Sequence, residues 1–358
     1  MNLSSSKAKL AIAGIICGLV AVALAYFGNP GNMAICIACF IRDTAGALKL
    51  HQAPPVQYVR PEIVGMVIGA FAIAVATKEY KATAGSSPMI RFVLGIVIMV
   101  GSLVFLGCPL RMVIRMSAGD LNAYVALIGF VGGVGTGAFA LKKGFSLGRA
   151  YDTHKTNGLV MPVLMTGILI LGVTTTMLVT STEGPGSMHA PILVALIGGL
   201  IFGAVAQKSR MCFAGSVRDV VLMKNFDLLT VIGGVFVVML TFNIAMGNFN
   251  LSFTGMPVAH SEHLWNILGM YAVGFAAVLA GGCPLRQLIL SGQGSSDAAV
   301  TVIGLFAGAA LCHNLGLASA GATSESAGGT TPAGRVACLI AIAVCFIIAF
   351  TNKRKTSK

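Results

Sequence analysis

Ten apolar runs dominate this 358-residue sequence. A helix needs about 20 predominantly apolar residues to cross the hydrocarbon core of a bilayer. Hydrophobic residues make up 56% of the chain and charged residues only 10%, whereas soluble domains carry about 25% charged residues. The pattern therefore predicts an all-α polytopic membrane protein. The predicted spans are residues 10–27, 62–77, 89–107, 121–141, 159–180, 190–207, 227–247, 264–281, 297–315 and 334–351.

Two cysteine motifs occur twice in the chain. Gly-Cys-Pro-Leu-Arg stands at 107–111 and again at 282–286, 175 residues later. A second element, which begins with cysteine and ends with Arg-Asp, stands at 36–43 and again at 212–219, 176 residues later. Two motifs repeated at almost one offset indicate an internal duplication, as in many transporters. The duplicated feature is a cysteine followed by an arginine within an apolar setting.

Four short segments lie between the predicted spans, and each begins at a motif cysteine. They are too short to cross a bilayer, so they are predicted to be re-entrant or broken helices, which are tolerated where protein or a water-filled cavity covers them. Pro109 and Pro284 favour a helix start directly after Cys108 and Cys283, because proline suits the first helical position. The segments are residues 36–48, 108–118, 212–223 and 283–292.

The distribution of basic residues predicts the topology. With the amino terminus in the cytoplasm, the inner segments hold 18 and the outer segments six of the 24 lysines and arginines, which satisfies the positive-inside rule. Each half then has five spans, an odd number, so we expect two inverted repeats whose four short helices meet near the midplane. Both termini are predicted to be cytoplasmic, with residues 181–189 and 316–333 outside.

The predicted division of the chain follows from the repeat. Residues 1–158 form the first half, with a basic cytoplasmic linker at 142–158, and the span at 159–180 completes the first repeat. Residues 181–358 form the second repeat.

The remaining composition excludes several classes of function. The net charge of +13 sits in loops between apolar runs, which is typical of attraction to anionic lipid and does not indicate nucleic-acid binding. No Walker motif is present, and no cofactor signature. Cys36-x-x-Cys39 has metal-ligand spacing, but a structural zinc site would need a second pair, so we expect no metal. Four further cysteines are expected to be small buried hydrophobes: Cys17, Cys312, Cys338 and Cys345.

The motif arginines allow two interpretations. An arginine near the bilayer centre is costly and usually has a function. Arg42 and Arg218 each precede an aspartate, so structural ion pairs and an anion-attracting role both stay open for them. Arg111 and Arg286 have no adjacent acid, which favours an electropositive field that draws an anion.

The motif cysteines suggest which anion. A helix amino terminus is a ready anion site, and a thiol there is a weak, soft hydrogen-bond donor. A row of thiols suits a large polarizable anion that carries sulfur or selenium. The alternative is a membrane thiol enzyme that forms a persulfide or disulfide on Cys36 and Cys39. The candidate pathway residues are Cys36, Cys39, Cys108, Cys212, Cys283, Arg42, Arg111, Arg218 and Arg286.

With its two Gly-Cys-Pro-Leu-Arg motifs and Cys212-x-x-Gly215-x-x-Arg218-Asp219, the chain resembles the YeeE/YedE family of bacterial inner-membrane sulfur transporters. The resemblance implies multi-pass import of thiosulfate, without catalysis, through a narrow central path marked by cysteines. The chain is more similar to the YedE-like branch, which is associated with selenium.

The motif match implies that the pathway cysteines are Cys36, Cys108, Cys212 and Cys283. Cys39 departs from the repeat because it stands where the second copy has Gly215, so whether Cys36 or Cys39 faces the path stays open. The family also implies a small cytosolic sulfur-carrier protein as recipient.

Overall fold

A computed structural model of the protein describes residues 3–323 and 326–353. Helices make up nearly all of its regular structure, which confirms the all-α prediction. The elements are α1 (Leu3–Tyr26), α2 (Ile37–Ala47), η1 (Pro54–Val56), α3 (Pro61–Ala76), β1 (Thr83–Ala84), α4 (Pro88–Phe105), α5 (Pro109–Ser117), α6 (Leu121–Lys142), β2 (Tyr151–Asp152), η2 (Lys155–Leu159), α7 (Val160–Thr174), α8 (Ile192–Lys208), α9 (Phe213–Met223), α10 (Asp227–Ala245), α11 (His263–Leu279), α12 (Pro284–Gln293), α13 (Ser296–Asn314) and α14 (Pro332–Thr351).

Ten stretches of the described residues are helical, long and apolar enough to cross a membrane. They coincide with the ten predicted spans, so the polytopic class is confirmed. Three of the stretches, Pro88–Ser117, Ile192–Met223 and His263–Gln293, each join a long helix to one of the short cysteine-headed helices. Those short helices are therefore the second parts of broken spans, whereas α2 stands alone between two loops.

Helix α7 is shorter than the predicted span at 159–180. It ends at Thr174, and Thr175 is extended, with φ −133° and ψ 158°. Residues 174–176 are three threonines in a row, and β-branched side chains lose rotamer freedom in a helix. The hydroxyls of Thr174 and Thr175 also donate to the carbonyls of Ile170 and Leu171. The threonine run therefore ends the helix before the apolar stretch is finished.

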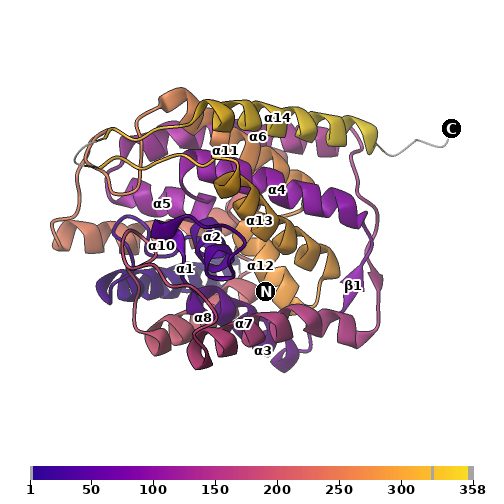
Figure 1. Cartoon of the computed structure of the whole chain (residues 1–358). Coiled ribbons are helices and arrows are strands. Elements are labelled where there is room, and N and C mark those ends of the chain that lie inside the picture. Colours follow the sequence, from indigo (N-terminus) through magenta and orange to yellow (C-terminus); the bar gives the residue numbers. More distant parts are fainter. Residues whose placement is uncertain (1–2, 324–325, 354–358) are drawn as a thin grey trace.

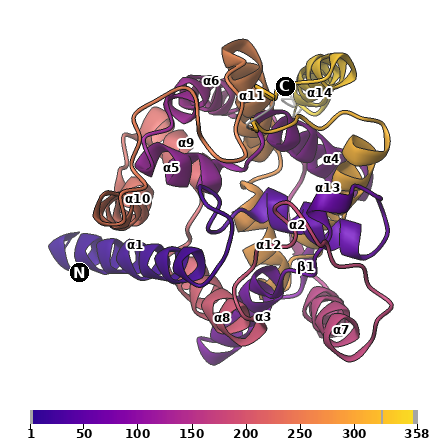
Figure 2. The ribbon, with the colours of Figure 1, turned by 60° about the vertical axis from the view of Figure 1, so that its left-hand side comes forward.

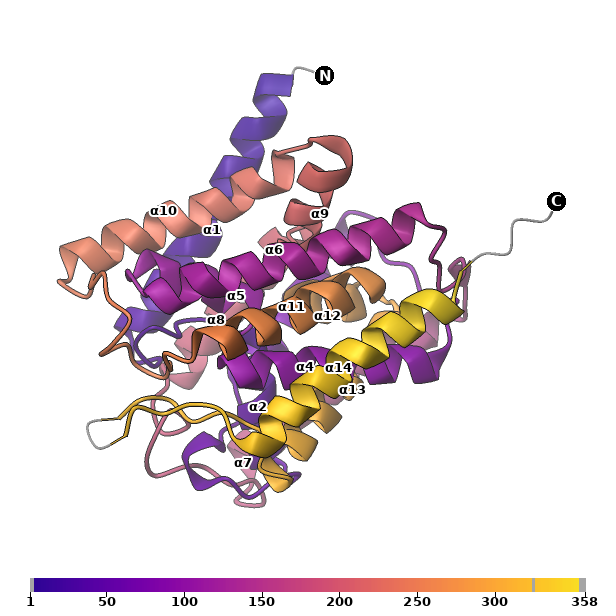
Figure 3. The same ribbon diagram turned by 90° about the horizontal axis from the view of Figure 1, so that it is seen from above.

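The corresponding helices of the two halves pack reciprocally. In chain order α1–α7 correspond to α8–α14; α1 packs on α10 and α8 packs on α3. In the same way α4 packs on α13 and α11 packs on α6. Figure 3 shows α10 lying across α1. Each half thus supplies packing partners of the other, in agreement with the sequence repeat, while the inversion of the two halves in a membrane stays a prediction.

The last helix of each half departs from this symmetry. Helix α14 packs on α4 and α11, whereas α7 packs on α3. Figure 1 shows α14 along the top of the molecule, and α3, α7 and α8 along the bottom. The two halves therefore share the arrangement of their inner helices but differ at the periphery.

Small residues bring the long helices into close contact. A Cβ atom on Gly133 of α6 would lie 2.1 Å from the carbonyl oxygen of Tyr271 in α11, and one on Gly129 would lie 2.0 Å from that of Ile267. Glycines spaced four apart allow such backbone approach between membrane helices. This contact fixes α11, whose end carries the second Gly-Cys-Pro motif.

The loops gather on two faces. Residues of the loops at 53–56, 184–185 and 318–323 line one common cavity, so the two loops predicted to be outside share a face. On another part of the surface β1 pairs with β2, Phe145 bridges to Lys353, and Thr83 bridges to Ser295. These are the loops predicted to be cytoplasmic, and the assignment of that face to the cytoplasm stays a prediction from the charge count.

Three of the short helices, α2, α5 and α12, are almost entirely buried, whereas only the first turn of α9 is buried. Figure 2 shows α2 and α12 near the centre of the view, surrounded by long helices. Helix α2 contacts α12 and α5 contacts α9, so each short helix meets one from the other half. Every residue of α2 is buried. The fold therefore joins short helices of opposite halves in the interior.

Candidate functional site

All four repeated cysteines are the N-cap residues of short helices. Cys36 and Cys212 have extended backbones, and the Sγ of each accepts a hydrogen bond from the backbone N–H three residues on, at 3.3 Å and 3.2 Å. Cys108 and Cys283 are followed by proline at the first helical position and make no side-chain cap bond. The helix starts predicted from Pro109 and Pro284 are confirmed. Each half thus has one capping thiol and one that leaves its helix end uncapped.

In both halves the capping thiol contacts the uncapped one. The Sγ atoms of Cys36 and Cys108 lie 3.9 Å apart, and those of Cys212 and Cys283 lie 4.0 Å apart. We call Cys36, Cys39 and Cys108 the first cysteine set, and Cys212 and Cys283 the second cysteine set. The fold reproduces the same thiol pair twice, although each pair joins residues that are distant in sequence.

Cys39 adds a third thiol to the first cysteine set alone. Its Sγ lies 2.8 Å from that of Cys36 and 3.6 Å from Nη1 of Arg111. In the second half Gly215 takes this place, and only its backbone N–H approaches Cys212. The thiol that corresponds to Cys212 is therefore that of Cys36, while Cys39 lies between Cys36 and an arginine.

Burial does not separate the motif cysteines from the others. Cys36, Cys39, Cys108 and Cys283 are at most 1% exposed, and Cys212 is 7% exposed. The four cysteines expected to be small hydrophobes are buried as well, at 0%. What distinguishes the motif cysteines is their contact with one another and with arginine.

Both Arg-Asp pairs of the repeat are ion pairs. Nη2 of Arg42 lies 2.6 Å from Asp43, and Nη2 of Arg218 lies 2.8 Å from Asp219. Asp43 also pairs with Arg60 at 2.7 Å, so one carboxylate serves two buried guanidinium groups. Sequence reasoning did not assign Arg60; its position beside Pro61, at the start of an apolar run, was the available signal.

Arg111 has no carboxylate partner among the described residues. Its guanidinium donates to the carbonyl oxygens of Asn32 at 3.1 Å, Val258 at 3.0 Å and Leu106. All three of these residues have positive φ, at 60°, 53° and 64°. Positive φ is strained for residues other than glycine, and most of all for a β-branched valine. Arg111 therefore holds three strained loops together while its own charge stays uncompensated.

Arg286 is bound more loosely. Its Nη1 donates to the side-chain oxygen of Gln207 at 3.3 Å, which is a neutral partner. A further buried arginine, Arg115, pairs with Asp120 at 2.6 Å, and the sequence interpretation gave it no role. Its sequence signal was an aspartate five residues later, at the cap of α6.

Cavities lie near both cysteine sets. The Arg42 cavity, of about 470 Å³, is lined by Arg42, Leu106, Val258 and His313 together with the loops of one face. A void of about 10 Å³ touches Cys212, Arg218, Gly281 and Gly282. Leu106 is two residues from Cys108, so the Arg42 cavity is close along the chain to the first cysteine set.

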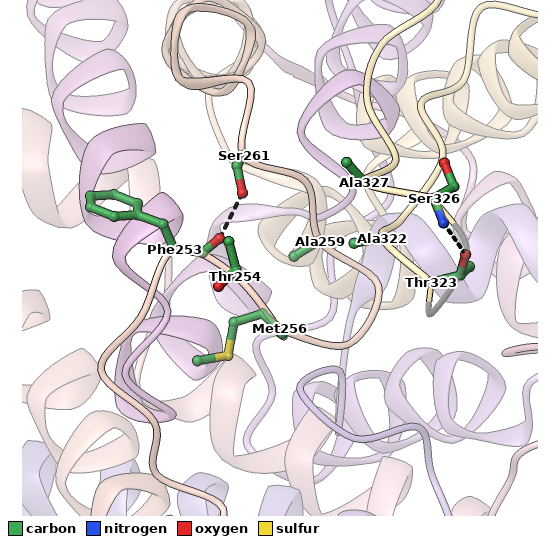
Figure 4. Close-up of a pocket in the computed structure, with 10 residues that line it drawn as sticks. Phe253, Thr254, Met256, Ala259, Ser261, Ala322, Thr323, Ser326 and Ala327 are labelled. Carbon is green, nitrogen blue, oxygen red and sulfur yellow. Dashed lines mark hydrogen bonds between the residues drawn. The ribbon is translucent and has the colours of Figure 1, made fainter.

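Another cavity, of about 290 Å³, lies between the loops at 253–261 and 322–327. Figure 4 shows its lining, with Ser261 donating to the carbonyl of Phe253 and the backbone of Ser326 donating to Thr323. None of its described lining residues is charged. It shares Ala322 and Thr323 with the Arg42 cavity but lacks the arginine that an anion site would use.

Comparison with known proteins gives a consistent result. The Sulphur transport family matches residues 208–357. The thiosulfate transporter TsuA of Escherichia coli is 29% identical over 111 residues, which cover 30% of this chain and 30% of that protein. TsuA of Spirochaeta thermophila is 31% identical over 107 residues, 30% of this chain and 32% of that protein. The matched segments thus span about a third of each relative, and the family resemblance expected from the motifs is confirmed.

Proposed function

We propose that this chain, similar to the YeeE/YedE sulfur-transport family, carries a small sulfur-containing anion such as thiosulfate across the bacterial inner membrane. One observation carries the proposal. In each half a buried pair of thiols at two helix starts is followed, three residues after the uncapped cysteine, by an arginine that has no carboxylate partner among the described residues.

The charge of the site favours an anion. Arg111 and Arg286 have no acidic partner in the described residues. Arg111 is also fully buried, and burial makes an uncompensated charge costly. The first turns of α5 and α12 add unpaired backbone N–H groups and the positive end of the helix dipole. A passing anion relieves this positive field, so the site is built to attract one.

The thiols favour a soft anion over a hard one. A hydroxyl or a backbone amide is the stronger donor toward sulfate oxygen, whereas a thiol is weak and polarizable. The terminal sulfur of thiosulfate is equally soft, and a selenium-containing anion fits the same reasoning. The proposal therefore includes both chalcogens, with the first and second cysteine sets as successive contact points.

In the proposal the described structure is the closed state of the path, because the thiols of each pair are in contact. With sulfur atoms 3.9 Å and 4.0 Å apart, the thiol pairs leave no room for an anion between them. Passage therefore requires the helix starts in each pair to separate. The chain turns between two helices just before both Cys-Pro sequences. Leu106 and Gly281, each two residues before the cysteine, have φ of 64° and 81° there.

The direction of transport in the proposal follows from the charge count. Both termini and the loops of the β1–β2 face lie in the cytoplasm, and the Arg42 cavity opens outside. A small cytosolic sulfur-carrier protein is the proposed recipient of the imported anion.

Uptake of labelled thiosulfate by proteoliposomes tests the proposal. We expect saturable uptake by the protein, and competition by selenium-containing anions that exceeds competition by sulfate. The Cys108→Ala variant, reconstituted at the same level, is the matched control and should match empty vesicles. Equal uptake by protein and empty vesicles would reject the transport function.

The same experiment separates transport from a thiol enzyme, which the 2.8 Å contact between Cys36 and Cys39 also allows. In that reaction a cysteine thiolate attacks the terminal sulfur of thiosulfate. The S–S bond of thiosulfate breaks, sulfite leaves with the electron pair, and a persulfide forms on the cysteine. Transport delivers intact thiosulfate to the lumen, whereas the enzyme reaction releases one sulfite for each persulfide.

A further inference from the structure

Three outer loops, together with Leu106 and Val258, surround the Arg42 cavity. The loops at 53–56, 184–185 and 318–323 supply most of its lining, together with Leu106 and Val258, whose carbonyls accept hydrogen bonds from Arg111. Most of its lining side chains are apolar or small. Two side chains depart from this character, Arg42 and His313, and they come from helices of different halves.

Arg42 has donor capacity that its ion pair does not use. Its Nε and Nη2 both donate to one oxygen of Asp43, at 2.9 Å and 2.6 Å. The other oxygen of Asp43 is taken by Arg60, so the three groups together carry one net positive charge. Among the described residues, Nη1 of Arg42 has no hydrogen-bond partner. The cavity is thus lined by a cation that is held in place but only partly neutralised.

His313 also presents a polar atom without a partner. Its Nε2 is buried and, in the part of the chain that the structure describes, makes no hydrogen bond. A buried polar atom left unpaired costs free energy that an added acceptor or donor would recover. His313 lies in the last turn of α13, and its ring stacks on His51 with centroids 4.4 Å apart.

The stacked partner of His313 is hydrogen-bonded to the backbone of Arg42. Nδ1 of His51 accepts from the backbone N–H of Ala53 at 3.3 Å, so its Nε2 carries the proton and donates to the carbonyl of Arg42 at 3.0 Å. Both ring nitrogens are therefore used in the neutral form, and burial lowers the pKa of His51. The ring under His313 is a rigid neutral platform attached to the backbone of Arg42.

We propose that Arg42 and His313 form a binding site for a small oxyanion, such as sulfate or thiosulfate, inside the Arg42 cavity. Nη1 of Arg42 and an Nε2–H of His313 donate to two oxygens of the anion, and Pro55, Val56 and Leu106 cover its remaining surface. Both donors recognise oxygen, so this site binds sulfate and thiosulfate alike.

The site lies one step before the first cysteine set. Leu106 lines the cavity, its carbonyl accepts from Arg111, and Cys108 follows two residues later. The place of this site on a transport path rests on the proposed function, whereas the binding itself does not. The discrimination between sulfate and thiosulfate is then made by the thiols of the first cysteine set.

Substitutions at His313 test the site through uptake kinetics. His313→Leu should raise KM for thiosulfate at least about tenfold, with kcat changed less than about twofold, because a donor to the bound anion is lost. His313→Gln places an N–H at a similar distance and should restore KM to within about threefold of the parent. His154→Leu, at an exposed histidine of the basic linker, is the control and should leave KM unchanged.

A binding assay keeps the test independent of transport. Ala320→Cys places an exposed thiol on the cavity wall, and Thr182→Cys places one on the neighbouring loop outside it, while all the native cysteines are buried. Thiosulfate and sulfate should both slow labelling of the first variant by a membrane-impermeant thiol reagent and not that of the second. The His313→Leu change should remove this protection.

The two experiments distinguish failure of the anion site from failure of the transport function. If the parent protein transports thiosulfate but His313→Leu leaves both KM and protection unchanged, the site is rejected and transport stands. If the anions protect the Ala320→Cys variant while the parent protein shows no uptake, the site stands and the transport function fails. If neither anion protects the Ala320→Cys variant, and this variant has the same melting temperature as the parent protein, the site is rejected.

Discussion

The two cysteine sets share their construction but differ around their arginines. In both, a thiol at a helix cap meets a thiol before a proline, at 3.9 Å in the first cysteine set and 4.0 Å in the second. Arg111 beside the first cysteine set is fully buried and held by three carbonyls. Arg286 beside the second is partly exposed and donates to one neutral amide, that of Gln207.

In the proposed function the thiol pair, which is the same in both halves, contacts the anion, whereas the surroundings of the arginine distinguish the two ends of the path. The thiol pair recurs because both halves form the same two helix starts. The surroundings of the arginine recur only in part. Arg111 donates to the carbonyls of Asn32, Val258 and Leu106, whereas Arg286 donates to the side chain of Gln207, which stands in the segment that corresponds to that of Asn32. We infer that the first cysteine set is sealed by backbone, while the second is the less constrained end of the path.

Removing a thiol from either pair should have the largest effect. Cys108→Ala and Cys283→Ala should each reduce thiosulfate uptake to the level of empty vesicles, because the uncapped thiol of each pair has no replacement. Cys338→Ala, at a buried cysteine of α14 outside both sets, should retain uptake at similar protein level. Loss of uptake in the Cys338→Ala variant as well would mean that cavity formation, and not pathway chemistry, explains the result.

Arg111 and Arg286 should respond differently to a change that keeps the charge. Lysine cannot donate in the several fixed directions of a guanidinium, so Arg111→Lys should release strained loops and lower the free energy of unfolding by about 2 kcal/mol or more. Arg286→Lys should cost less than about 1 kcal/mol, because it loses one neutral contact. Thermal unfolding in detergent, with uptake measured in parallel, compares the two. Equal destabilisation would remove the distinction between the two ends.

Changing sulfur to oxygen should alter selectivity more than rate. Cys108→Ser or Cys283→Ser keeps a hydrogen-bond donor of nearly the same size, but replaces the polarizable sulfur atom with a less polarizable oxygen atom. We expect the preference for thiosulfate over sulfate to fall less than about tenfold, since one weak and one ordinary hydrogen bond differ by at most about 1 kcal/mol. Competition of sulfate against labelled thiosulfate measures this ratio. An unchanged ratio in both variants would assign selection to the shape of the path.

The third thiol should matter least. Cys39 has no counterpart in the second cysteine set, where Gly215 stands, so Cys39→Ala makes the first set resemble the second. Uptake should stay within about threefold of the parent, a change of about 0.6 kcal/mol. A complete loss would instead identify Cys39 as the pathway thiol of the first half, in place of Cys36.

Much of the fold was predictable because its causes are local. Apolar runs of membrane length gave the spans, and Pro109 and Pro284 gave the starts of α5 and α12. The exception was α7, where the threonine run after residue 173 ends the helix inside an apolar stretch. Composition averaged over a window does not register this effect, since threonine is only mildly polar.

The sequence by itself determined the membrane class, the duplication, and the position of each motif cysteine at a helix cap, since run length, repeat offset and proline act within a few residues. Only the tertiary structure decided the partners of those residues. Arg111 meets Val258 across 147 positions, Arg60 shares Asp43 with Arg42, and His313 stacks on His51 from the other half. Such contacts depend on how distant helices pack, and no local pattern specifies which carbonyl or ring will lie within reach of a buried side chain.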